Sequence, residues 1–374
     1  MDLKNSVVDN RIGARIRAIR QRQSLSQDEL AQSLGLNARQ ILSAIETGAR
    51  SIKVQELLLI AEQLGVPIEY FTDPFRIDGE VRFSWRQKNV STEILVKYES
   101  KASEWIGAYR TLAPKVGVNP PLIRPSLSLT KQSRYEDAMD AGERFVRDFK
   151  LGDVPARRLV EVMEDDLNIL VLMVNAEEGI SGAACRLPEM DTVLISRNDI
   201  VGRRNFGIAH ELFHILTFEA MPPSHVESSD ERGGDRVEHL ANNFAATVLI
   251  PASIINKFGP WRELDQDSLV EKLNRIASKL EVTSTALMWR LVSLGSLPES
   301  LAQSIPESSL RNNGGKVSDA ENPPLFSKRF VEVLAGALNQ GHLSIRRAAT
   351  LVGVPLEALP EIMDAHGVEF TLEA

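Results

Sequence analysis

Residues 205–218 read NFGIAHELFHILTF and contain the pattern HExxH, formed by His210, Glu211 and His214. The stretch has no Pro, and its sequence predicts a helix. On a helix, side chains four residues apart project to the same side, one turn apart. The two imidazoles can then bind one Zn²⁺, with Glu211 beside them to accept a proton from the metal-bound water. A surface helix that carries two His and a Glu without a metal is the alternative.

A catalytic zinc needs a third protein ligand, and the residues after this helix supply a limited set. The candidates are Glu219, His225, Glu227, Asp230, Glu231, Asp235, Glu238 and His239. Residues 236–249 predict a helix in which Glu238 is in phase with the apolar Ala241 and Ala245. A buried carboxylate without a partner is costly, so a role as ligand explains the position of Glu238. His239 lies about 100° away on the same helix and stays an alternative.

The surrounding sequence predicts a small sheet among helices. Three apolar or alternating runs predict strands over 167–174, 179–186 and 192–196. Periodic segments predict further helices over 137–149, 155–164 and 267–280. This part of the chain is therefore expected to be α+β and mainly α.

The segments AHELFH (209–214) and EHLANNFAATVLIP (238–251) resemble the ImmA/IrrE family of zinc peptidases. The resemblance covers about residues 137–297 and implies a zincin-like domain. In that family the first motif supplies two His ligands and the catalytic Glu, and the Glu of the second motif is the third ligand. The resemblance thus implies one Zn²⁺ per chain, with ligands His210, His214 and Glu238 and the catalytic Glu211.

Two features of the resemblance concern the shape of the site. Phe213 stands where the family usually has Gly. The sequence does not select the group that would stabilise an oxyanion, for which the candidates are His225, His239, Arg203 and Arg204. The strands predicted over 180–186 and 193–196 offer an edge to which an extended substrate can add.

The N-terminal part reads as five short helices over residues 11–72. Ser26 and Glu29 have the spacing of a capping box, Gly35 ends that helix, and Asn37 is expected to cap the next one. The stretch IGARIRAIRQRQSLSQDELAQSLGLNARQILSAIETG, residues 12–48, resembles Xre/Cro-type repressors. That resemblance extends over residues 11–71 and implies a lambda-repressor-like helix-turn-helix (HTH) domain.

The helix-turn-helix resemblance places several side chains against double-stranded operator DNA. The start and outward face of the recognition helix hold Asn37, Ala38, Arg39, Gln40 and Ser43. Arg39 is expected to bond guanine, and Gln40 adenine. Gln27 is expected to contact a phosphate, and Arg15, Arg17 and Arg50 to add salt-sensitive phosphate contacts. Glu46 lies too late in the helix for base reading and is expected to make a structural bond.

Charge and composition agree with a DNA-binding protein. Residues 11–53 carry eight Lys and Arg against three acidic residues, whereas the whole chain of 374 residues has a net charge of −8. A basic block on an acidic protein points to a module that faces a polyanion. The hydrophobic content of 43% excludes wholesale disorder. The single cysteine, Cys185, an N-terminus without a signal peptide and the absence of a long apolar run predict a soluble cytoplasmic protein that does not associate with membranes.

The expected organisation has five parts. They are the HTH domain over 1–75, a helical connector and Pro-rich linker over 76–136, the zinc peptidase domain over 137–297, a flexible linker over 298–325 and a small helical, HTH-like segment over 326–374. The expected function is that of a transcriptional regulator whose peptidase domain cleaves a repressor-type protein or itself in a stress or mobile-element response.

Two other functions fit the same sequence. One is a non-proteolytic regulator whose zinc domain is a sensor or binds a partner, and the other is an antitoxin or defence-operon control protein. A homodimer is expected on DNA, since one recognition helix reads only half of a two-fold site. Residues 91–112, with Trp105 and Tyr109, are the expected place of contact.

Overall fold

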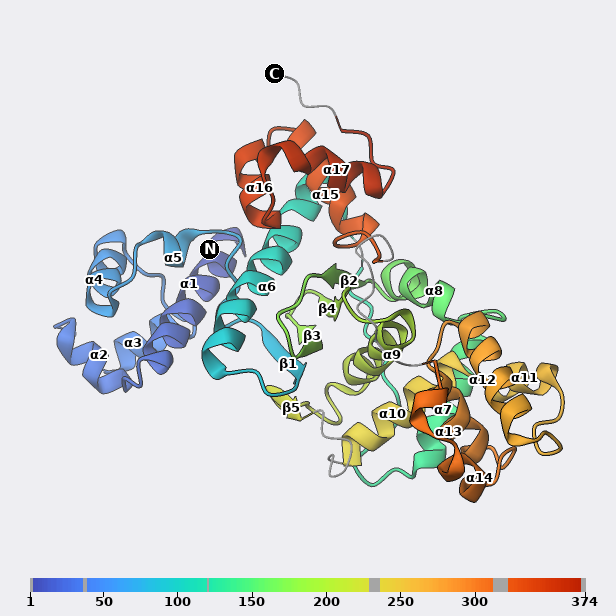
Figure 1. The fold of residues 1–374 in the computed structure, drawn as a ribbon. Coiled ribbons are helices and arrows are strands. Elements are labelled where there is room, and N and C mark those ends of the chain that lie inside the picture. The colour runs from blue at the N-terminus through green and yellow to red at the C-terminus, as the bar shows by residue number, and fades with distance from the viewer. Residues whose placement is uncertain (1–2, 36–38, 120, 229–235, 312–321, 371–374) are drawn as a thin grey trace.

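The computed structural model describes residues 3–35, 39–119, 121–228, 236–311 and 322–370. The fold is α+β and mainly α, with one small sheet surrounded by helices (Figure 1). Among the described residues, no helix combines the length and the apolar character that crossing a membrane requires.

Five helices form the N-terminal part, as the sequence predicts. They are α1 (Leu3–Arg22), α2 (Gln27–Ser33), α3 (Arg39–Glu46), α4 (Val54–Leu64) and α5 (Glu69–Thr72). The capping box of α2 is confirmed, because the Glu29 N–H donates to Ser26 Oγ at 3.1 Å and the Ser26 N–H donates to Glu29 Oε2 at 2.7 Å. Gly35 follows α2 with a φ of 65°, a left-handed conformation that favours glycine. The predicted cap at Asn37 lies outside the described residues.

A five-stranded sheet with the order β2-β4-β3-β1-β5 lies at the centre of the rest of the chain. Its strands are β1 (Arg82–Gln87), β2 (Ile169–Val174), β3 (Ile180–Arg186), β4 (Asp191–Ser196) and β5 (Val226–Ser228). The predicted runs correspond to β2, β3 and β4. Strands β3 and β4 pair antiparallel, and β2 and β4 pair parallel.

Strand β1 corrects the expectation that residues 76–136 are only a helical connector and a Pro-rich linker. It pairs antiparallel with β3, where Phe83 lies opposite Cys185, and parallel with β5, where Trp85 lies opposite Val226. The strand has six residues, and its partners lie far away in sequence. A short run whose pairing is non-local leaves little local signal in the sequence.

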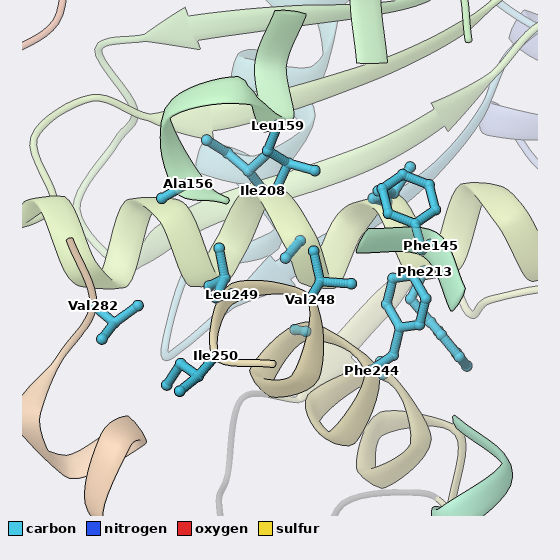
Figure 2. Close-up of a cluster of buried hydrophobic side chains, with 14 of the residues drawn as sticks. Phe145, Ala156, Leu159, Ile208, Phe213, Phe244, Val248, Leu249, Ile250 and Val282 are labelled. Atoms are coloured by element: carbon cyan, nitrogen blue, oxygen red, sulfur yellow. The ribbon is translucent and has the colours of Figure 1, made fainter. Parts of the chain in front are cut away.

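One face of the sheet packs against α9 (Val201–Thr217) and a group of helices around it. The first members of this group are α7 (Tyr135–Asp148), α8 (Ala156–Glu161) with the π-helix Val162–Asp166, and α10 (Arg236–Leu249). The others are α11 (Ala252–Ile255), α12 (Gln266–Leu280), α13 (Ser284–Ser293) and α14 (Glu299–Ser304). Figure 2 shows the core between them, with Phe213 of α9 close to Phe244 of α10.

The segment 298–325, expected to be a flexible linker, is packed in the part that the structure describes. It begins with α14, and Ala302 and Leu310 are buried in the core around α9. Asn274 of α12 donates a hydrogen bond to the Ser309 carbonyl at 3.0 Å and accepts one from the Arg311 N–H at 2.8 Å. Residues 312–321 lie outside the described residues.

The other face of the sheet packs against α6 (Thr92–Leu112) and the C-terminal helices. These are α15 (Lys328–Asn339), α16 (Ile345–Val352) and α17 (Leu359–Ala365), so the predicted helical C-terminal segment is confirmed. Trp105 of α6 donates from its indole N–H to the Leu351 carbonyl at 2.9 Å, and Tyr109 stacks on Phe330 with ring centres 6.4 Å apart. Both aromatic residues are buried within the chain, so the expectation that they form a dimer contact is wrong.

Because Trp105 joins α6 to the C-terminal helices, Trp105→Ala should leave a cavity and an unpaired carbonyl in this core. We expect it to lower the free energy of unfolding by about 3–5 kcal/mol. The measurement is guanidinium unfolding followed by circular dichroism. The control is Trp289→Ala, because Trp289 is 42% exposed and its loss should cost less than about 1 kcal/mol. Equal effects of the two variants would contradict this assignment.

Candidate metal centre and nucleic-acid interface

Helix α9 carries the HExxH residues into the interior of the molecule. His210, Glu211 and His214 are all buried, with exposed fractions of 1%, 0% and 0%. The two Nε2 atoms lie 3.0 Å apart. Glu238 of α10 reaches the same point, with its carboxylate oxygens 3.2 Å from His210 Nε2 and 3.4 Å from His214 Nε2. The structure therefore brings together the three residues that the sequence indicates as ligands.

The geometry of these three residues fits a divalent cation of the zinc type. One ligand atom from each lies within 4.8 Å of the other two. Nitrogen ligands about 2.0–2.1 Å from one Zn²⁺ in a tetrahedral arrangement would be separated by a little more than 3 Å. Two imidazoles and one carboxylate also form the ligand set of a catalytic zinc, which keeps a fourth position open.

Asn242 supports the orientation of His210. Its Oδ1 lies 3.0 Å from His210 Nδ1, and an amide oxygen can only accept, so the ring donates from Nδ1 and keeps the Nε2 lone pair for a metal. Asn242 follows Glu238 by one helical turn on α10. Sequence reasoning missed this residue, although the four-residue spacing from Glu238 is a signal that could have identified it.

Burial also sets the protonation state of the two imidazoles. Removal from water disfavours the charged ring, and this burial lowers the pKa of His210. For His214, burial and the neighbouring His210 together lower the pKa to about 3. Both rings are therefore neutral at physiological pH. A neutral imidazole is the form that binds a metal.

Glu211 lies on the side of α9 that faces the sheet. A Cβ atom placed on Gly182 of β3 would lie 3.6 Å from Glu211 Cγ and 2.9 Å from the Leu194 carbonyl oxygen. A side chain at position 182 would therefore crowd the sheet beside Glu211. Gly182 allows α9 to approach the sheet where Glu211 lies.

Several other candidates have different partners. His239 is exposed on α10, and its ring centre lies 6.0 Å from that of Tyr135. Of the two candidates on α10, Glu238 is therefore the one that lies beside His210 and His214. His225 pairs with Glu99 at 2.7 Å. Glu219 accepts from Arg186 at 3.1 Å. Asp230, Glu231 and Asp235 lie outside the described residues, and the side chain of Glu227 is not described.

Phe213, the departure from the family pattern, belongs to the hydrophobic core. It is fully buried, and its ring centre lies 5.6 Å from that of Phe244 (Figure 2). The Phe213 ring also packs edge-on against the His214 ring, with the ring centres 5.8 Å apart. Phe213 therefore supports the helix packing behind His214.

The recognition helix α3 presents two of its predicted DNA contacts to solvent. Arg39 and Gln40 are exposed at its start, and Ser43 is half-buried. Arg39 donates to Gln27 Oε1 at 3.1 Å, and Gln27 donates to Glu46 Oε2 at 2.8 Å. Asn37 and Ala38, also predicted to contact DNA, lie outside the described residues.

Glu46 has the structural role expected from the sequence. It is buried and accepts two hydrogen bonds from Arg20, at 2.6 and 3.0 Å. A bidentate Arg–carboxylate pair of this kind fixes α3 against α1. Gln27 bonds the same carboxylate, so the start of α2 is tied to this pair as well.

The basic residues predicted to contact phosphate differ in their surroundings. The prediction that Arg15 contacts DNA is wrong, because Arg15 is buried and donates to the carbonyl oxygens of Phe71 and Asp73 at 2.7 and 2.9 Å. Its position on the inner face of α1 was not visible from charge alone. Arg17 is exposed, and Arg50 is partly exposed beside Glu56.

Comparison with known proteins finds family similarity in two parts of the chain. Residues 16–71 match the family model for the Helix-turn-helix, and residues 164–291 match that for the IrrE N-terminal-like domain of the M78 peptidases. The chain is 25% identical over 298 residues to the HTH-type transcriptional regulator PrpR of Mycobacterium tuberculosis. That alignment covers 69% of this chain and 59% of PrpR, so the chain matches about three fifths of that relative's length.

Among solved structures, the apo form of the competence regulator ComR from Streptococcus vestibularis matches over 97% of this chain and 100% of that one. The sequence identity is 11% and the TM-score is 0.17, which is too low to support an argument about fold. The two family matches carry the assignment. The chain joins a helix-turn-helix domain of the Xre type to an IrrE N-terminal-like domain of the M78 peptidase family in one polypeptide.

Proposed function

We propose that this protein is a DNA-binding transcriptional regulator with a zinc-dependent endopeptidase domain. Its substrate is a repressor-type protein or a second copy of itself. The observation that carries the proposal is the buried cluster of His210, His214 and Glu238, whose ligand atoms lie within 4.8 Å of one another. The similarity to PrpR, which is described as a transcriptional regulator, supports the regulatory part.

In the proposed reaction His210, His214 and Glu238 hold one Zn²⁺ per chain. When bound, the ion lowers the pKa of water and polarises the carbonyl of the peptide bond. Glu211 accepts the proton of the attacking water and passes it to the leaving amine. Burial of Glu211 strengthens its electrostatic effect on groups in the site.

For DNA binding, we propose that α3 enters the major groove with Arg39 and Gln40 at base edges. Gln27, Arg17 and Arg50 contact phosphates in this arrangement. Such domains read two-fold sites, so we propose a homodimer on the operator.

A second function, in which the metal domain is a sensor, is favoured by the contacts between the two domains. Arg11 of α1 donates to Glu189, in the turn between β3 and β4, at 3.1 Å. Arg110 of α6 lies 2.7 Å from Glu80 and 3.6 Å from Glu189. The Arg11–Glu189 pair joins α1 to the turn between β3 and β4, and Arg110 adds α6 to the same contact. We propose this contact between the DNA-binding helices and the sheet as the route by which occupancy of the metal centre affects DNA binding.

Metal binding and cleavage should separate by mutation. We expect Glu211→Gln to keep about one zinc per chain while cleavage is lost, because it preserves shape and removes the proton acceptor. His210→Ala, His214→Ala and Glu238→Ala should each lose most of the metal. Zinc is measured by plasma mass spectrometry, and cleavage by mass spectrometry after incubation with purified Xre-type repressors.

His239→Ala is the matched control, since His239 is adjacent to Glu238 and directed to Tyr135. It should keep both zinc and cleavage. Loss of zinc in His239→Ala with retention in Glu238→Ala would show that the ligand assignment is wrong. Regulation that survives Glu211→Gln in cells would favour the sensor function over proteolysis.

Arg39→Ala should weaken binding to the specific operator by about 1–3 kcal/mol and relax the preference at one base. Fluorescence anisotropy with operators altered at single positions measures both effects. Arg275→Ala on α12 removes the same charge from an exposed position outside the HTH domain and is the control. A loss of affinity of equal size in both variants would mean that only net charge matters at Arg39.

A further inference from the structure

Strand β1 directs one side chain towards the metal centre. Side chains alternate between the two faces of a strand. Phe83 and Trp85 of β1 belong to the core on the α6 face. Arg86 is therefore on the opposite face, which is covered by α9. Its neighbour in the antiparallel register is Gly182, the residue next to Glu211.

The guanidinium of Arg86 packs on a ring of α9 that neighbours a proposed ligand. Its Cζ is 6.0 Å from the centre of the Phe206 ring. Phe206 precedes His210 by one helical turn, and the two rings are 6.3 Å apart. Arg86 is half-buried and, among residues whose side chains are described, its guanidinium forms no ion pair.

The positive charge of Arg86 acts on all three proposed ligands. Burial is the main reason for the lowered pKa of His210, and the charge of Arg86 lowers it further. It acts in the same direction on His214, after burial and the neighbouring His210. Burial raises the pKa of Glu238, whereas the charge of Arg86 lowers it and so favours the ionised carboxylate.

We propose that Arg86 donates hydrogen bonds to the carbonyl oxygen of the peptide bond that is cleaved, and stabilises the negative charge that develops there. This inference rests on the proposed peptidase function. The water oxygen bonds to the carbonyl carbon, and the carbonyl π electrons move to the oxygen that Arg86 contacts. When the electrons return, the carbon–nitrogen bond breaks and the amine leaves with the proton from Glu211.

The groups that the sequence suggested for this role are placed elsewhere. Arg204 is buried and donates to the Asp199 carbonyl at 2.8 Å. Arg203 is exposed on α9, His239 faces Tyr135, and His225 pairs with Glu99. A preorganised donor at the developing charge is the largest single contribution in many hydrolases. Arg86 supplies a cation with several N–H groups at this site.

Arg86 also comes from outside the part of the chain that matches the peptidase family. That match covers residues 164–291, whereas β1 lies at residues 82–87, between this match and the helix-turn-helix match over residues 16–71. The proposed active site is therefore incomplete without the segment that connects the two domains. Movement of this segment when the protein binds DNA would change the position of the oxyanion donor.

The test compares Arg86→Gln and Arg86→Lys in the full, zinc-loaded chain. We expect kcat to fall by about 10²–10³-fold in Arg86→Gln, as when one oxyanion donor is removed, with KM changed by less than about threefold. Arg86→Lys should recover part of kcat, because it keeps the charge. Arg82→Gln, on the same strand and exposed, is the control and should change neither constant.

A second readout does not depend on proteolysis. Acetohydroxamate binds catalytic zinc through two oxygens, one of which occupies the position of the carbonyl oxygen. Calorimetry should show at least about tenfold weaker binding to Arg86→Gln at unchanged zinc content, and no change in Arg82→Gln. Unchanged acetohydroxamate affinity in Arg86→Gln would overturn the assignment. If no substrate is cut but this tenfold loss is found, the peptidase function fails, and Arg86 is assigned only as a hydrogen-bond donor to an oxygen ligand at the metal centre.

Discussion

Burial of polar side chains on α9 is the constraint on which the rest of this structure depends. His210, Glu211 and His214 are withdrawn from water, and buried polar groups cost several kcal/mol each unless they have partners. Glu238 and Asn242 of α10 supply partners for the imidazoles, and their spacing of one turn fixes how α10 lies on α9. A bound cation would satisfy the two Nε2 atoms and the carboxylate together.

The connecting segment links this centre to the DNA-binding helices. Glu80 precedes β1 and lies between Arg110 of α6, at 2.7 Å, and Arg11 and Arg15 of α1, at 3.5 and 3.8 Å. A carboxylate shared by three cations, two of them largely buried, fixes α1 against α6. β1 then carries Arg86 into the sheet. The HTH domain and the proposed active site are therefore joined by packed structure, where the sequence predicted only a helical connector and a Pro-rich linker.

The parts that sequence could predict are those encoded locally. The HExxH helix, the capping box at Ser26 and the apolar strands β2 to β4 each depend on residues a few positions apart, and all are present. The predictions were wrong where packing between residues far apart in the sequence determines the position of a side chain or strand. Arg15 reads as a DNA contact by charge, but the fold turns it towards the Phe71 carbonyl. β1 and Arg86 depend on pairing with β3, which no local period encodes, although the alternation in RFSWRQ is a weak signal.

The most direct test of the central claim is crystallography of the zinc-loaded chain at the zinc absorption edge. We predict one anomalous peak per chain, about 2.0–2.2 Å from His210 Nε2, His214 Nε2 and a Glu238 oxygen, with a fourth position open. An anomalous peak at other residues, or a centre closed by a fourth protein ligand, would contradict a catalytic zinc at this place.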